Sequence, residues 1–175
     1  LLKKQSNLIK EADMQRHCFF NYDVDFEGRT FYFGEGIGEG SHATHNLIKS
    51  IMYFNREDKE KQIKIIMNCP GGDVFDGYAI YDILKASRAP VDILVAGQAS
   101  SMGAIILQAG RKRLALPNST IMVHDGTMSI DEANQRDTEK WAKWGKDFRI
   151  NMYKVLAKKS GKTVKYWKEK CAHDY

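Results

Sequence analysis

Two segments of the sequence place a serine and a histidine where acyl-transfer chemistry is feasible. Gly97-Gln-Ala-Ser-Ser-Met-Gly103 puts Ser101 where an apolar strand gives way to a helix. Pro117-Asn-Ser-Thr-Ile-Met-Val-His124 ends the next apolar strand with His124. A serine hydroxyl is a weak nucleophile at neutral pH unless a neighbouring base takes its proton. We therefore expect Ser101 to be a nucleophile and His124 to be its base.

Backbone N–H groups near Ser101 could stabilise the negative charge of a reaction intermediate. The first N–H groups of a helix lack intrahelical partners, and the helix dipole favours negative charge there. The N–H of Met102 is therefore one predicted donor. Gly71 and Gly72 follow another expected strand, and glycine lets the backbone approach a substrate closely. The N–H of Gly72 is the second predicted donor of this oxyanion hole.

The residues alone leave other interpretations open. A serine at a helix start is most often an N-cap, and Ala99 stands where the G-x-S-x-G motif of α/β-hydrolases has its first glycine. Ser100 is a second hydroxyl that could be the nucleophile, although packing or capping is more typical of its position. Period-two alternation points Asp125 away from the face of His124. The carboxylate that orients His124 must then come from elsewhere, and Asp174 is one of several candidates.

Metal and disulfide chemistry have little support in the sequence. His42-x-x-His45 has the spacing of a metal pair, but no further ligand at a recognisable spacing completes a zinc site. The three cysteines, Cys18, Cys69 and Cys171, are odd in number and far apart. This spacing fits neither a disulfide framework nor a metal knuckle. We expect no metal, no cofactor and a reducing, cytoplasmic compartment.

Length and composition suit one domain, with or without an appendage. Hydrophobic residues make up 43% of the 175 residues, and no apolar run reaches the roughly eighteen residues that a membrane span needs. The net charge is +5, with basic residues concentrated between positions 140 and 170, as is typical of a solvated helix face. Neither a zinc finger nor an RNP or helix-turn-helix pattern is present. We therefore expect no nucleic-acid partner and no membrane partner.

Strand and helix patterns alternate along most of the chain. Strands are expected at residues 30–33, 63–67, 91–96, 112–116 and 120–123, and helices at 43–55, 74–87 and 101–109. The side chains expected to face the core from the first two helices are Leu47, Ile48, Ile51, Met52 and Phe54, and then Tyr78, Ala79, Tyr81, Ile83 and Leu84. This alternation predicts parallel βαβ units with right-handed crossovers, and hence an α/β fold.

A long helix is expected over residues 131–160, ended by Gly161. Its apolar side chains recur at steps of three and four and form one stripe: Trp141, Trp144, Phe148, Met152 and Val155. Such a stripe is either internal core or a subunit interface, where aromatic residues are enriched.

Four ordered motifs resemble the proteolytic subunit of the Clp protease (ClpP), a family of serine peptidases. The similarity covers about residues 31–174 and rests on Asn68-Cys-Pro-Gly-Gly72, Gly77-Tyr-Ala-Ile-Tyr-Asp82, the Gly97–Gly103 segment, and Ala115-Leu-Pro-Asn-Ser-Thr-Ile-Met-Val-His124. The resemblance implies a crotonase-like β/α superhelix with a parallel sheet and a helical handle. Residues 1–18 are polar and mixed in charge, so we expect a terminal arm or helix there. The resemblance implies that 19–175 form one domain with 125–160 as the handle region.

The resemblance also assigns roles to single residues. Ser101, His124 and Asp174 match the family's Ser-His-Asp triad, and Asp174 lies thirteen residues past Gly161 as in the family. Gly72 and Met102 match the two oxyanion-hole amides. The implied function is a serine endopeptidase that cleaves unfolded proteins or peptides inside a homo-oligomeric, self-compartmentalising assembly.

The family's architecture implies the partners of this chain. Family members form heptameric rings, stack two rings by their handles, and receive substrate from an ATP-dependent unfoldase. Alternatives are a phage head-maturation protease with the same chemistry, a catalytically inactive structural ring subunit, and an acyl-CoA enzyme of the crotonase type. The sequence after His124 departs from the family's Gln-Pro and reads Asp125-Gly-Thr-Met-Ser-Ile-Asp131. This departure favours a divergent phage-encoded or accessory member.

Overall fold

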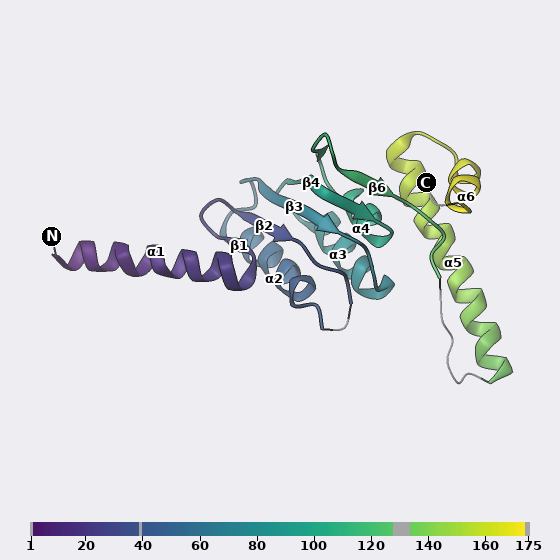
Figure 1. Ribbon diagram of the computed structural model, residues 1–175, viewed down its shortest axis with the longest axis horizontal. Coiled ribbons are helices and arrows are strands. Elements are labelled where there is room, and N and C mark those ends of the chain that lie inside the picture. Colours follow the sequence, from purple (N-terminus) through teal and green to yellow (C-terminus); the bar gives the residue numbers. More distant parts are fainter. Residues whose placement is uncertain (1, 39, 128–133, 174–175) are drawn as a thin grey trace. The chain divides into compact units, whose positions relative to one another are not determined.

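The computed structural model describes residues 2–38, 40–127 and 134–173 (Figure 1). The chain divides into two compact units, Leu1–Ile121 and Met122–Tyr175, called the first and second unit below. The first unit holds Ser101, and the second unit holds His124.

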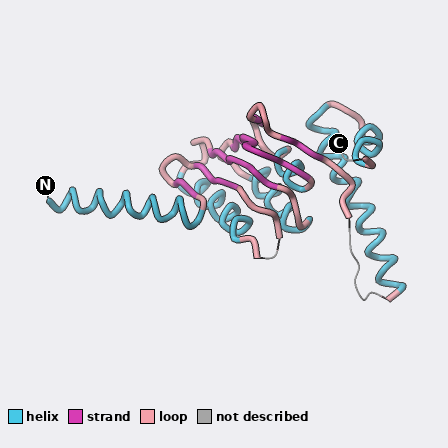
Figure 2. Tube along the Cα trace, in the orientation of Figure 1, coloured by secondary structure: helices cyan, strands magenta, loops and turns pink. Residues whose placement is uncertain are grey.

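A mostly parallel sheet is the framework of the first unit (Figure 2). Its strands in spatial order are β1 (Val24–Asp25), β2 (Thr30–Phe33), β3 (Ile63–Cys69), β4 (Val91–Ser100) and β5 (Arg113–Ala115), and β6 (Thr120–Met122) pairs with β4. β1 is antiparallel to β2, and the neighbours from β2 to β5 are parallel. The predicted α/β class is confirmed.

Three helices connect the parallel strands: α2 (His42–Glu57), α3 (Val74–Ala86) and α4 (Met102–Leu107). Ser41 and Asp73 cap the first two, because their side chains accept hydrogen bonds from the N–H groups of Thr44 and Asp76. α2 packs on β2 and α3, α3 packs on α4, and α4 packs on β4. A further helix, α1 (Leu2–Tyr22), precedes the sheet and extends beyond the expected residues 1–18.

The core confirms some predicted positions and corrects others. Side chains of β3 alternate between buried and less buried positions, as expected for a strand with one face on a core. On α3, however, Gly77, Ile80 and Leu84 form the buried row, and Ala79, expected inside, is exposed. This helix is apolar nearly all round, so periodicity could not select its inner face. Met52, also expected inside, is 58% exposed on α2.

The second unit contains two helices, α5 (Gln135–Ser160) and α6 (Val164–Cys171), that pack on each other. Asn134 caps the start of α5 by accepting a hydrogen bond from the Asp137 N–H. Gly161 ends α5 in the left-handed conformation, with φ +70°, as the sequence predicts. The expected first residues of this helix, 131–133, lie outside the described residues.

Along the apolar stripe of α5, the side chains become more exposed from Met152 towards Trp141. Met152 is buried, Trp144 and Phe148 are half-buried, and Trp141 is 43% exposed. The ring centroids of Trp144 and Phe148 lie 5.3 Å apart, so the aromatic side chains cover one another along the helix. The core interpretation therefore applies to Met152, and the interface interpretation stays a prediction for Trp141.

Asp92 on β4 organises the edge of the sheet near β5. The Nε and Nη2 atoms of Arg111 each donate a hydrogen bond to its carboxylate, both at 2.8 Å. Gln62 Nε2 donates at 2.9 Å, and the N–H of Lys112 donates at 3.2 Å. These donors, Arg111 foremost, lower the pKa of Asp92 from its ordinary value despite partial burial.

We predict that the stabilisation from Asp92 is lost in acid. Because its pKa is lower in the folded chain than in the unfolded chain, the stabilisation is complete above about pH 4 and falls as pH drops through the folded pKa. In denaturant unfolding, Asp92→Asn should lower the free energy of unfolding by about 1 kcal/mol near pH 7. The difference from wild type should shrink towards pH 3.

The matched control is Asp13→Asn, since Asp13 forms an exposed ion pair with Arg16. Exposed pairs contribute little, so this variant should match wild type at both ends of the pH range. An Asp92→Asn difference that stays constant from pH 7 to pH 3 would contradict the prediction.

Candidate functional site

Ser101 occupies a sharp turn between β4 and α4. Its backbone has φ +54° and ψ −121°, a conformation that persists only where the surroundings enforce it. β4 ends at Ser100 and α4 begins at Met102, so the turn resembles the nucleophile elbow of other hydrolases. The Ser101 hydroxyl does not cap α4. The N-cap alternative for this side chain is therefore wrong, and the expected helix start at Ser101 moves to Met102.

α4 is held in place by close packing on all sides. All six of its residues are buried. A Cβ on Gly103 would come within 2.9 Å of the Cys69 carbonyl oxygen, and a Cβ on Gly77 would come within 2.5 Å of Met102 Cε. Because these glycines let neighbouring elements approach so closely, the N–H of Met102 has little freedom to move.

The register of β3 and β4 brings the loop after β3 beside Ser101. Cys69 pairs with Ala99, so two residues further along each chain segment Gly71 lies next to Ser101. A Cβ on Gly71 would be 2.7 Å from Ser101 Cβ and 3.2 Å from the Met102 nitrogen. Gly71 also has φ +97°, a region that favours glycine. Both constraints require glycine at this position.

The N–H of Gly72 faces away from the segment that packs against its loop. Ile37 donates its N–H to the Gly71 carbonyl at 2.8 Å and accepts from the Asp73 N–H at 2.8 Å. In such a parallel bridge Ile37 forms hydrogen bonds with both neighbours of Gly72. The N–H of Gly72 therefore points away from Ile37. Gly72 itself is exposed.

Two competing nucleophiles near Ser101 are engaged or inactive. Ser100 is buried and donates its hydroxyl to Gln98 Oε1 at 3.0 Å, which supports the packing interpretation. Burial raises the pKa of the Cys69 thiol to about 11, although the Gly71 N–H donates to its sulfur. Cys69 is therefore a neutral thiol near pH 7 and a poor nucleophile.

His124 lies in the second unit, directly after β6. Its side chain is half-buried, and Val123 before it is buried. The N–H of Asp125 donates to the Cys171 carbonyl at 2.9 Å, and the Asp125 carboxylate accepts a hydrogen bond from the Tyr153 hydroxyl. The residues around the predicted base are thus tied to both α5 and α6.

The structure brings some predicted site residues together and leaves others in separate parts of the chain. In the first unit, Gly71, the residue before Gly72, lies against Ser101 and Met102, and His124 belongs to the second unit. Asp174 lies outside the described residues. The Asp125–Tyr153 bond was not predicted, because nothing in the sequence distinguishes Tyr153 from the other tyrosines. The approach of Gly71 to Ser101 was also missed, although the Pro-Gly-Gly sequence signals a special backbone.

Neither a metal centre nor a membrane span is found in the described parts of the chain. Across residues 2–38, 40–127 and 134–173, no three His, Cys, Asp or Glu side chains gather in a way that could hold a metal ion. His42 and His45 are both exposed on α2. Within the same residues, every helix is too short or too polar to cross a bilayer.

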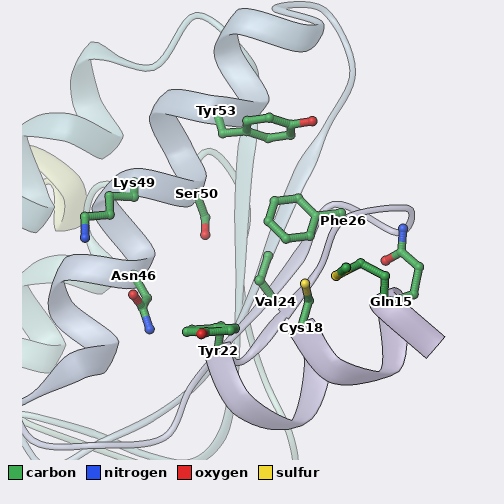
Figure 3. Close-up of a pocket in the computed structure, with 10 residues that line it drawn as sticks. Gln15, Cys18, Tyr22, Val24, Phe26, Asn46, Lys49, Ser50 and Tyr53 are labelled. Carbon is green, nitrogen blue, oxygen red and sulfur yellow. The ribbon is translucent and has the colours of Figure 1, made fainter. Parts of the chain in front are cut away.

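A separate cavity of about 640 Å³ lies between α1, β1 and α2 (Figure 3). Cys18 and Tyr22 line it from α1, and Tyr53 lines it from α2. None of the predicted catalytic or oxyanion-hole residues lines this cavity.

Comparisons with known proteins match the chain to one family. The family model described as Clp protease matches residues 15–175. The ATP-dependent Clp protease proteolytic subunit of Deinococcus radiodurans is 39% identical over 138 residues. That alignment covers 78% of this chain and 66% of the relative, so the chain spans about two thirds of the relative's length.

We predict that Gly71→Ala slows the reaction of Ser101 with a fluorophosphonate by at least about tenfold. The added Cβ would collide with Ser101 Cβ and the Ser100 carbonyl, both 2.7 Å away, and would displace the turn from its neighbouring N–H donors. Losing one such donor costs about a hundredfold or more in comparable sites. Intact-protein mass spectrometry over time gives the rate.

Gly40→Ala is the matched control for backbone strain. Gly40 has φ +85°, and a Cβ there would meet nothing within 4 Å. This variant should react at nearly the wild-type rate. A wild-type rate in Gly71→Ala would show that the close approach to Ser101 does not matter.

Proposed function

Because the chain belongs to the Clp protease family, we propose that it is a serine endopeptidase that cleaves unfolded proteins or peptides. The observation that carries the proposal is the strained strand-to-helix turn at Ser101, with Gly71 packed against it and Met102 starting a buried helix. Strain of this kind is typical of functional sites.

In the proposed mechanism, Ser101 Oγ attacks the carbonyl carbon of a peptide bond while His124 accepts its proton. Asp174 holds the imidazole in the productive tautomer and stabilises the imidazolium. His124 then protonates the departing amine. Water, deprotonated by His124, hydrolyses the acyl-enzyme and restores the Ser101 hydroxyl. Every step uses groups of the chain and water.

The oxyanion of each tetrahedral intermediate accepts hydrogen bonds from the N–H groups of Gly72 and Met102. These donors contribute most when they are already in place before charge develops. The buried packing of α4 restrains the Met102 N–H. The Ile37 bonds to Gly71 and Asp73 orient the Gly72 N–H. Both donors are therefore preorganised by interactions within the first unit.

We further propose that the enzyme works as a homo-oligomeric ring supplied by a partner. The relative is named an ATP-dependent Clp protease proteolytic subunit. This chain contains no P-loop motif, so ATP-driven unfolding would fall to a separate unfoldase. The family resemblance supports a heptameric ring, and two such rings stacked by the α5 region would enclose a chamber.

We predict that a fluorophosphonate labels Ser101 and that Ser101→Ala lowers peptide cleavage by at least about a thousandfold. Removing the nucleophile leaves only binding and the oxyanion donors. Peptide mapping by mass spectrometry identifies the labelled residue, and a fluorogenic peptide reports cleavage by the native assembly.

The matched control is Ser100→Ala, which removes the neighbouring hydroxyl and its bond to Gln98. It should retain most of the peptidase activity. Labelling of Ser100 in place of Ser101 would refute the assignment of the nucleophile. Absence of both labelling and cleavage in the wild-type assembly would refute the proposed function.

A further inference from the structure

A buried cluster in the second unit joins the residue after His124 to both helices of that unit. The Tyr153 hydroxyl on α5 donates to the Asp125 carboxylate. The Asp125 N–H donates to the carbonyl of Cys171, the last residue of α6, at 2.9 Å. Asp125 is thus held through its side chain by one helix and through its backbone by the other.

Burial favours a persistent hydrogen bond between Tyr153 and Asp125. Tyr153 is 4% exposed and Cys171 is 1% exposed. Burial, and then the bond to Asp125, raises the pKa of Tyr153, although Arg149 on the same helix opposes this. Burial, and then the charge of Asp125, raises the pKa of Cys171 to about 11. Both groups therefore keep their protons around neutral pH, and Tyr153 remains a donor.

The two described residues that follow Asp125 have little packing of their own. Gly126 and Thr127 are exposed, and a Cβ on Gly126 would meet nothing within 4 Å. Both neighbours of His124 in the chain are therefore anchored, Val123 by burial and Asp125 by its two hydrogen bonds.

We propose that Asp125 and Tyr153 are positioning residues that hold the His124 imidazole where it can act as the base. This inference rests on the proposed function, because it assigns the pair a task in that mechanism. Small displacements of a general base slow a reaction severely. The Asp125–Cys171 bond also ties the His124 segment to the end of α6, three residues before Asp174 in the sequence.

The first test is Tyr153→Phe, which keeps the buried ring and removes only the hydroxyl. We expect kcat for a fluorogenic peptide to fall about tenfold with little change in KM. Hydrogen-exchange mass spectrometry of the native assembly should show faster exchange of the Asp125 amide. Asp125→Ala should reproduce both effects, and the double variant should add little because the two residues act as a unit.

Asp125→Asn provides the rescue, because an amide oxygen still accepts the Tyr153 hydrogen bond. This variant should keep most of kcat and of the amide protection. A merely structural loss of packing would not be restored in this way.

Ser160→Ala is the matched control in the same pair of helices. The Ser160 hydroxyl accepts from Trp167 Nε1 at 2.8 Å and donates to the Leu156 carbonyl at 2.7 Å. It ties α5 to α6 through partners that belong to these two helices. Ser160→Ala should keep the wild-type kcat and the wild-type exchange of the Asp125 amide.

Each outcome decides the inference. A wild-type kcat in Tyr153→Phe overturns it, and so does an equal loss of kcat in Ser160→Ala, which would indicate general loosening of the unit. If the wild-type assembly neither cleaves peptide nor reacts with a fluorophosphonate, the proposed function fails. The exchange of the Asp125 amide would then still show whether Tyr153 anchors the His124 segment.

Discussion

The strained backbone of Ser101 is the constraint on which the proposed site depends. A residue with φ +54° keeps that conformation only while its neighbours leave no alternative. Here the neighbours are a fully buried helix that begins at Met102 and a glycine loop pressed against the turn at Gly71. Hydrophobic burial of α4 thus helps to hold the Ser101 hydroxyl, the proposed nucleophile, and the Met102 N–H in fixed relation.

The pairing of β3 with β4 likewise fixes the positions of the loops that follow these two strands. Parallel strands end at one edge, and the pairing of Cys69 with Ala99 puts the loops after β3 and β4 side by side. Glycines at those ends remove the side chains that would otherwise separate the loops. The two proposed oxyanion donors, Gly72 and Met102, therefore come from segments thirty residues apart in sequence. In the second unit, Asp125 links the His124 segment to α5 and α6 through polar bonds rather than through strand pairing.

Much of the fold follows from local patterns in the sequence. Strand and helix alternation predicts the parallel sheet, and Gly161 predicts the end of α5. The inner face of α3 could not be predicted, because its residues are apolar on most sides and its buried face is selected by packing against α2 and α4. The strained backbone at Ser101 and the hydrogen-bond partner of Tyr153 could not be predicted either, because both depend on contacts between residues distant in sequence. The triad and the assembly come from family resemblance rather than from local pattern.

The most direct test of the account is a crystal or cryo-EM structure of the native assembly after reaction with a fluorophosphonate. The phosphonyl oxygen on Ser101 stands in for the oxyanion of a tetrahedral intermediate. We expect that oxygen to lie about 2.7–3.1 Å from the nitrogens of both Gly72 and Met102, with the His124 imidazole within hydrogen-bond reach of Ser101 Oγ. A phosphonyl oxygen turned away from both amides, or an imidazole held elsewhere, would contradict the account.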